Sequence, residues 1–138
     1  MWKVIVNPPG LAKPSGYSHG IEARGRLLFL AGQTALDAAG RIVARGDLVG
    51  QFRQALTNLR TVIETQGGSL GDLVKLTVFV LDKDDYRAKA KAIGQVYREM
   101  LEGYYPATTL VEVKALWDAE ALIELDGIAV LDDRRSPG

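Results

Sequence analysis

Apolar residues recur every three to four positions in two segments of the chain, the period of a helix with one buried face. The first segment covers residues 47–66, with Asp47 placed as an N-cap and Gly67-Gly68 following its end. The second covers residues 84–101, and Gly103 and Pro106 prevent it from continuing. The pattern therefore predicts two amphipathic helices.

The other apolar runs are short and rich in β-branched residues, which is typical of strands. They predict strands at residues 4–6, 27–31, 41–44, 74–81, 108–116 and 122–131. The order of strands, helix, strand, helix, strands indicates an α+β fold with two helices packed on one face of a sheet. We expect a single domain over residues 1–131 and a polar C-terminal tail over residues 132–138.

Both faces of the predicted sheet carry apolar side chains. In one strand Leu27 and Phe29 point to one face, and Leu28 and Leu30 point to the other. Two helices cover one face only, and a monomer rarely exposes a large apolar surface. The pattern therefore predicts a symmetric oligomer that buries the second face. The alternative is that the N-terminal loop covers this face.

Composition narrows the choice of partner and compartment. The chain has 17 basic and 17 acidic residues, a formal net charge of zero and no run of lysine or arginine, which argues against nucleic acid or membrane surfaces as partners. It has no cysteine, so disulfides, thiolate catalysis and cysteine metal sites are excluded. We see no apolar leader and no apolar run near the ~20 residues that span a bilayer. A cytoplasmic location fits these features.

Three side chains are candidates for chemistry from pattern alone. Glu124 interrupts an apolar strand, where a carboxylate either lies on a polar rim or is partly buried with a raised pKa. A raised pKa would suit a general acid or base, and Asp126 shares its strand face. His19 is the one histidine, and without a second ligand at a recognisable spacing it does not predict a metal site. We expect His19 to be a structural or pocket-wall residue.

Four blocks give the chain a family resemblance. They are residues 17–21 (YSHGI), 31–33 (AGQ), 105–109 (YPATT) and 123–129 (IELDGIA). Together, in this order and at these intervals, they resemble the RidA/YjgF family of imine and enamine deaminases. The resemblance implies a chorismate-mutase-like fold, a homotrimer and small-molecule sites between neighbouring subunits. It also implies hydrolysis of reactive imines, such as those formed from 2-aminoacrylate, to a keto acid and ammonia, with no metal or organic cofactor.

The resemblance also implies roles for individual residues. Glu124 matches the acid that positions and activates water, Gly32 matches a backbone contact to the ligand, and Tyr17 matches a pocket tyrosine. Thr108 stands where active members have the arginine that binds the substrate carboxylate. Leu110 stands where a cysteine is frequent.

The exchange at Thr108 leaves several functions open. The first is a deaminase with altered substrate choice, and the alternative is a non-catalytic metabolite-binding or regulatory trimer. Another cation, such as Lys13 or Arg24, could also reach the site from a neighbouring subunit. RNA cleavage, a label attached to some relatives, is the weakest reading because the net charge is zero.

Overall fold

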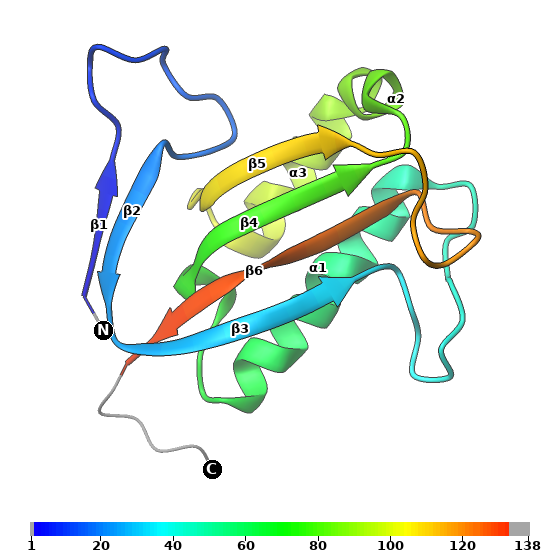
Figure 1. Ribbon diagram of the computed structural model, residues 1–138, viewed down its shortest axis with the longest axis horizontal. Helices are drawn as coiled ribbons and strands as arrows, with labels where there is room; N and C mark the ends of the chain where they lie inside the picture. Colours follow the sequence, from blue (N-terminus) through cyan, green and yellow to red (C-terminus); the bar gives the residue numbers. More distant parts are fainter. Residues whose placement is uncertain (1, 133–138) are drawn as a thin grey trace.

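The computed structural model describes residues 2–132 as a mixed sheet with helices on one face (Figure 1). Four strands form the sheet in the order β3 (Arg26–Gln33), β6 (Ile123–Leu131), β4 (Leu73–Val80) and β5 (Ala107–Glu112). β4 and β5 are parallel, and the other neighbours are antiparallel. The predicted α+β class is confirmed. Apart from Asp132, the predicted tail lies outside the described residues.

α1 (Leu48–Thr65) forms where the apolar period predicts it. The side chain of Asp47 accepts a hydrogen bond from the Gly50 N–H (3.0 Å), which satisfies one of the free donors of the first turn. Its apolar face, including the fully buried Phe52 and Leu59, packs against β3 and β6. These residues form the core together with Leu125 and others from the covered face of the sheet.

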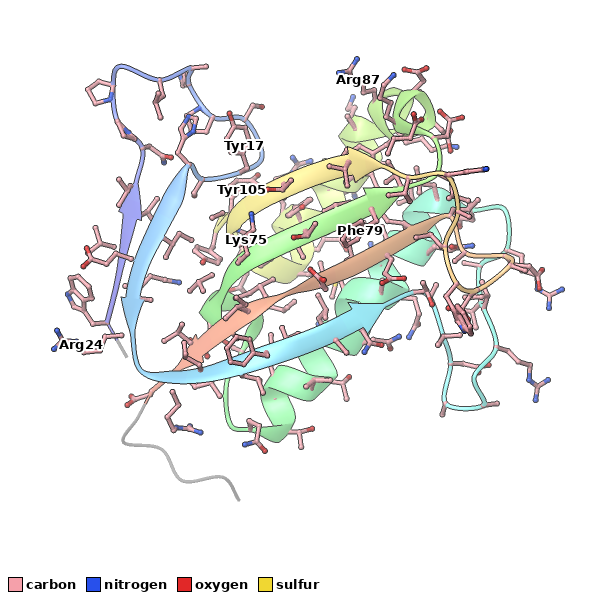
Figure 2. All side chains as sticks on the ribbon, viewed as in Figure 1. Tyr17, Arg24, Lys75, Phe79, Arg87 and Tyr105 are labelled. Carbon is pink, nitrogen blue, oxygen red and sulfur yellow. The ribbon has the colours of Figure 1, made fainter. Side chains whose placement is uncertain are left out.

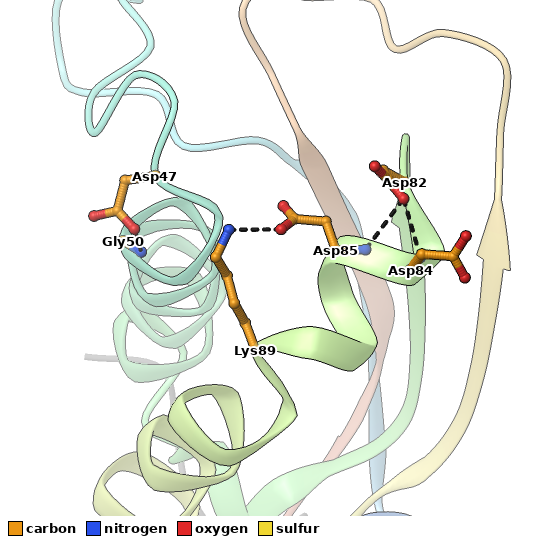
Figure 3. A network of polar contacts seen from close by, with 6 residues as sticks. All are labelled: Asp47, Gly50, Asp82, Asp84, Asp85 and Lys89. Atoms are coloured by element: carbon orange, nitrogen blue, oxygen red, sulfur yellow. Dashed lines mark hydrogen bonds and ion pairs between the residues drawn. The ribbon is translucent and has the colours of Figure 1, made fainter.

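The second predicted helix is two helices, which corrects the expected pair to three. α2 (Lys83–Ala88) begins after Asp82, whose carboxylate accepts from the backbone N–H groups of Asp84 and Asp85 (Figure 3). At Lys89 the backbone leaves helical values (φ −103°, ψ 14°), and α3 (Ala90–Leu101) follows. Lys89 is the C-cap of α2, and its ammonium also pairs with the Asp85 carboxylate of the same helix (2.6 Å).

The sheet face opposite the helices stays open along β3. There the side chains of Leu27 and Phe29 are 63% and 71% exposed. The ribbon of β1 (Trp2–Val6) and β2 (Gly20–Arg24) stands beside the sheet instead of over it (Figure 1). Lys3 holds it there, because its ammonium bonds the Gly71 carbonyl oxygen (2.5 Å) and lies 3.7 Å from the Tyr104 ring centre. The N-terminal segment therefore does not cover the exposed side chains of β3, and burial of this face by another copy remains a prediction.

Two predicted strands differ in the structure. Residues 41–44 form no strand, and only an isolated bridge joins Leu36 to Ile42. β5 ends at Glu112, four residues before the predicted end at Leu116. The chain then leaves the sheet in a loop that carries the 95% exposed Trp117. Apolar residues in both segments produced the expectation, but neither segment has a neighbouring strand along its full length to complete its hydrogen bonds.

Candidate functional site

The predicted site residues lie in two groups on opposite faces of the sheet. Gly32 and Glu124 meet on the open face, where β3 and β6 pair. Thr108 and Leu110 belong to β5 and pair in register with Leu76 and Val78 of β4, which are fully buried under the helices. Paired residues of neighbouring strands point to the same face. Thr108 and Leu110 therefore point to the helix side, away from Glu124.

A β-bulge brings Gly32 against Glu124. Leu30 pairs with Gly127 and Gln33 with Leu125, so β3 has one more residue than β6 between these pairs. A Cβ built on Gly32 would overlap Oε2 of Glu124 and lie 3.0 Å from its Cδ. Glycine is therefore the residue that leaves room for the carboxylate in this position. Bulges are frequent next to functional sites because they change the direction of a side chain.

The Glu124 carboxyl lies half-buried among other acids. Burial raises the pKa of Glu124, and the negative charges of Asp126 and Asp118 raise it further. Asp118 is itself held in place, because Thr34 Oγ1 donates to its Oδ2 (2.6 Å). Each of these causes disfavours the charged form of Glu124. The carboxyl is thus able to accept and return a proton nearer neutral pH than an ordinary glutamate.

Tyr17 reaches the other face because its neighbour is bonded to the start of β5. Ser18 Oγ donates to the Tyr105 carbonyl oxygen (2.6 Å), and the Ser18 N–H donates to the Pro106 carbonyl oxygen (3.2 Å). His19 contacts the edge of the Tyr17 ring, with ring centres 5.2 Å apart. Figure 2 shows Tyr17 and Tyr105 together near the start of β5. These contacts fix the loop that carries Tyr17.

A cavity of about 560 Å³ lies between this loop, β5 and the helices. Ligand sites in proteins usually have volumes of about 300–1,000 Å³. Tyr17, Thr108 and Leu110 all line it, together with three further tyrosines and Arg98 of α3. The Thr108 hydroxyl donates to the Pro106 carbonyl oxygen (2.8 Å). The structure therefore brings three of the five predicted site residues into one cavity.

The remaining candidates lie elsewhere. His19 is not part of the cavity wall, and its Nε2 lies 2.7 Å from the Ala12 carbonyl oxygen. Its ring contacts Tyr17, which does line the cavity. Asp126 lies beside Glu124 on the open face and pairs in register with Thr77. Within residues 2–132, no cluster of three or more histidine and acidic side chains is placed to hold a metal ion.

With this geometry in view, the comparisons with known proteins decide the family. The model of the family described as Endoribonuclease L-PSP matches residues 10–131. This chain belongs to that family, the RidA/YjgF family. The predicted resemblance is confirmed.

Relatives of known structure share the fold over nearly the whole chain. A Yersinia pestis protein of the Rid family is 36% identical, and the match covers 95% of this chain and 100% of that one with a TM-score of 0.84. E. coli TdcF, crystallised with bound serine, is 30% identical, with 94% and 98% of the two chains covered and a TM-score of 0.68. A family member thus binds a small molecule that carries a carboxylate.

One relative carries the name of an enzyme. The 2-iminobutanoate/2-iminopropanoate deaminase of the mite Dermatophagoides farinae is 28% identical over 131 residues, which cover 94% of this chain and 98% of that protein. Imine deamination is therefore an activity named within this family. No helix in the described part of this family member is long and apolar enough to cross a membrane.

Sequence reasoning missed Arg98 and the tyrosines of the cavity wall. In the sequence, Arg98 is one of several charged residues on an amphipathic helix, and nothing distinguishes it from a solvated surface residue. One weak signal was present. Ala90, Gly94 and Arg98 follow one another at intervals of four, and two small residues before a long one on one helix face indicate a hollow beneath it.

Proposed function

We propose that this protein hydrolyses a reactive imine or enamine, with Glu124 activating the attacking water. The observation that carries the proposal is the Glu124 carboxyl, held against Gly32 with a raised pKa. In the reaction, Glu124 takes a proton from water while the oxygen attacks the C=N carbon. The carboxyl passes this proton to the nitrogen, which gives a carbinolamine. The same carboxylate then transfers the hydroxyl proton to the amine nitrogen, the C–N bond breaks, and ammonia leaves a keto compound behind. General acid–base catalysis of this kind contributes about 10²–10⁴-fold.

We propose further that a complete site needs two copies of the chain. In one copy Glu124 and the cavity lie on opposite faces of the sheet, so one ligand cannot contact both. β5 is an edge strand, and the open face of β3 carries the exposed side chains of Leu27 and Phe29. An assembly that joins this edge to the open face of the next copy would complete the site and cover the apolar surface. Three copies in a closed ring satisfy this arrangement by symmetry.

Thr108 supports a change of substrate within the same chemistry. A threonine hydroxyl is a single neutral group, whereas arginine makes two parallel charge-assisted hydrogen bonds to a carboxylate. We therefore propose a substrate other than the usual 2-aminoacrylate product. A cytoplasmic location fits a chain without cysteine.

Glu124→Gln tests the catalytic proposal. We expect the variant to lose about 10²–10⁴-fold in turnover, measured as keto-acid release above the spontaneous rate when 2-aminoacrylate or a bulkier imine is generated in situ. Light scattering should give both proteins the mass of three 15.0 kDa chains, 3 × 15.0 = 45 kDa. Turnover that is unchanged in Glu124→Gln would contradict the role of Glu124. A monomeric mass with full activity would contradict the shared site.

The second candidate is a metabolite-binding trimer without turnover, and Thr108 is the observation that favours it. In that case no imine is hydrolysed faster in the presence of the protein, but a bound metabolite raises its Tm by mass action. A panel of carboxylated and neutral imines, followed by both keto-compound release and thermal shift, separates the two functions.

A further inference from the structure

The cavity beside Thr108 has one charged wall residue. Among the described residues that line it, Arg98 is the sole charged side chain, and no aspartate or glutamate contributes to the wall. The polar atoms there are otherwise hydroxyls and backbone groups. The Tyr86 hydroxyl is protonated at neutral pH, as that of any tyrosine is, and burial raises its pKa further, to about 12. The electrostatic character of the cavity is therefore positive.

Gly94 leaves the space that Arg98 uses. Both residues lie on the face of α3 that lines the cavity, one turn apart. A Cβ built on Gly94 would lie 3.5 Å from Nη1 of Arg98, so the guanidinium folds back over Gly94 toward the start of the helix. A long side chain at position 94 would occupy this place instead.

The Arg98 charge is not neutralised by its neighbours. The adjacent Glu99 pairs with Arg53 of α1, at 2.8 Å between Nη2 and Oε2. Within residues 2–132, the guanidinium of Arg98 has no ion pair and no side-chain hydrogen bond. A positive charge in a cavity that lacks an acid is a binding group for an anion.

We propose that Arg98 binds the carboxylate of the ligand, and that it supplies at this cavity the positive charge that Thr108 does not. The sequence left open a cation from a neighbouring subunit, such as Lys13 or Arg24, whereas Arg98 belongs to the same chain as the cavity. Within one copy, neither Lys13 nor Arg24 lines the cavity, and Figure 2 shows Arg24 at the far end of β2 from Tyr17. The claim that this ligand is the substrate rests on the proposed function. The claim that Arg98 binds an anion does not depend on it.

The other residues that line the cavity indicate which chemical group the ligand carries besides its carboxylate. Tyr17, Tyr105, Ile93 and Leu110 present rings and methyl groups, and the Tyr97 and Tyr105 ring centres lie 5.7 Å apart. Aromatic rings stack on one another at such distances. A three-carbon imine would leave most of about 560 Å³ empty. The chemistry therefore points to a carboxylate joined to an aromatic or branched apolar group.

The test compares a charged probe with its neutral isostere. Phenylacetate and phenylacetamide have the same size and differ in the negative charge, and calorimetry measures their affinities for the full-length protein. We expect the wild type to prefer phenylacetate about 10- to 100-fold, the worth of one charged hydrogen bond. Arg98→Gln should abolish this preference, and Arg98→Lys should retain part of it.

Arg87→Gln is the matched control. Arg87 is the same residue type on the adjoining helix α2, does not line the cavity, and should leave the preference for phenylacetate intact. Far-UV circular dichroism confirms that each variant folds, which is expected because Arg98 lies at an exposed position of the helix.

Two outcomes overturn the inference. One is a preference for phenylacetate that survives in Arg98→Gln, and the other is a wild type that binds the two probes equally or not at all. Neither outcome depends on turnover, so the same titrations on Glu124→Gln separate this inference from the proposed function. Intact phenylacetate binding in Glu124→Gln, together with unchanged turnover, would reject the catalytic proposal and keep the anion site.

Discussion

Gly32→Ala isolates the position of the Glu124 carboxylate from its chemistry. The new Cβ would lie 3.0 Å from Glu124 Cδ and overlap Oε2, whereas carbon atoms in contact are about 3.5–4.0 Å apart. The glutamate is the flexible partner, so its carboxylate has to withdraw by about 1 Å. A misplacement of about 1 Å can cost 10²-fold in rate. That factor corresponds to about 2.7 kcal/mol of transition-state stabilisation.

The folded state should tolerate this substitution much better than the reaction does. Gly32 has no positive φ, so alanine fits its backbone. Alanine also lowers the entropy of the unfolded chain, which is worth about 0.4–1 kcal/mol of stability and offsets part of the cost of moving Glu124. We expect a Tm close to that of the wild type and a value of kcat/KM lower by about 10²-fold.

The assay is keto-compound release with the best imine substrate, measured beside a matched glycine variant. Gly10→Ala is suitable, because a Cβ at Gly10 would meet no atom within 4 Å and its φ is not positive. This control should keep full activity. Equal kcat/KM in Gly32→Ala and Gly10→Ala would refute the idea that Gly32 exists to place Glu124. An equal loss in both would show that the effect is not specific to the site.

Two further predictions address the pKa of Glu124 and the helix of Arg98. Asp126→Asn removes a negative charge that raises the pKa of Glu124, so this pKa should fall. Because Glu124 acts as a base above its pKa, the acidic limb of the kcat/KM profile should move to lower pH. A limb that stays in place or moves to higher pH contradicts this account. Gly94→Ala should stabilise α3 by about 0.5–1 kcal/mol in urea unfolding, because alanine favours the helix over glycine and its Cβ would make an ordinary contact with Arg98. A loss of stability would mean that the guanidinium cannot share this space.

The sequence was sufficient where local signals agreed. α1 has a capping aspartate, a regular apolar face and a terminal glycine pair, and it forms within one residue of the predicted bounds. The division at Lys89 has no such signal, because neither glycine nor proline occurs between Lys83 and Ala92. The short strand at residues 41–44 fails for a different reason. A strand needs a neighbour, and its partner cannot be read from its own sequence.

The candidate site shows the same limit at the level of single side chains. The pattern identified Glu124 as an unusual acid, but its contact with Gly32 depends on a bulge between two strands about ninety residues apart. Likewise, the division of the site between two faces follows from the register of β5 on β4. Residue types and spacing did not contain this information, so the sequence assigned Gly32, Glu124 and Thr108 to a ligand site without showing on which face of the sheet each one lies.

That division bears on how this family member could change its ligand. The Glu124 carboxylate is placed by β3, β6 and the acids around it, none of which lines the cavity. The cavity is built by β5, α3 and the Tyr17 loop. A substitution at Thr108 therefore alters the group that meets the ligand without moving the carboxylate. With Arg98 in the cavity wall, the positive charge shifts from the strand to the helix, and the acid–base chemistry of Glu124 requires no compensating change.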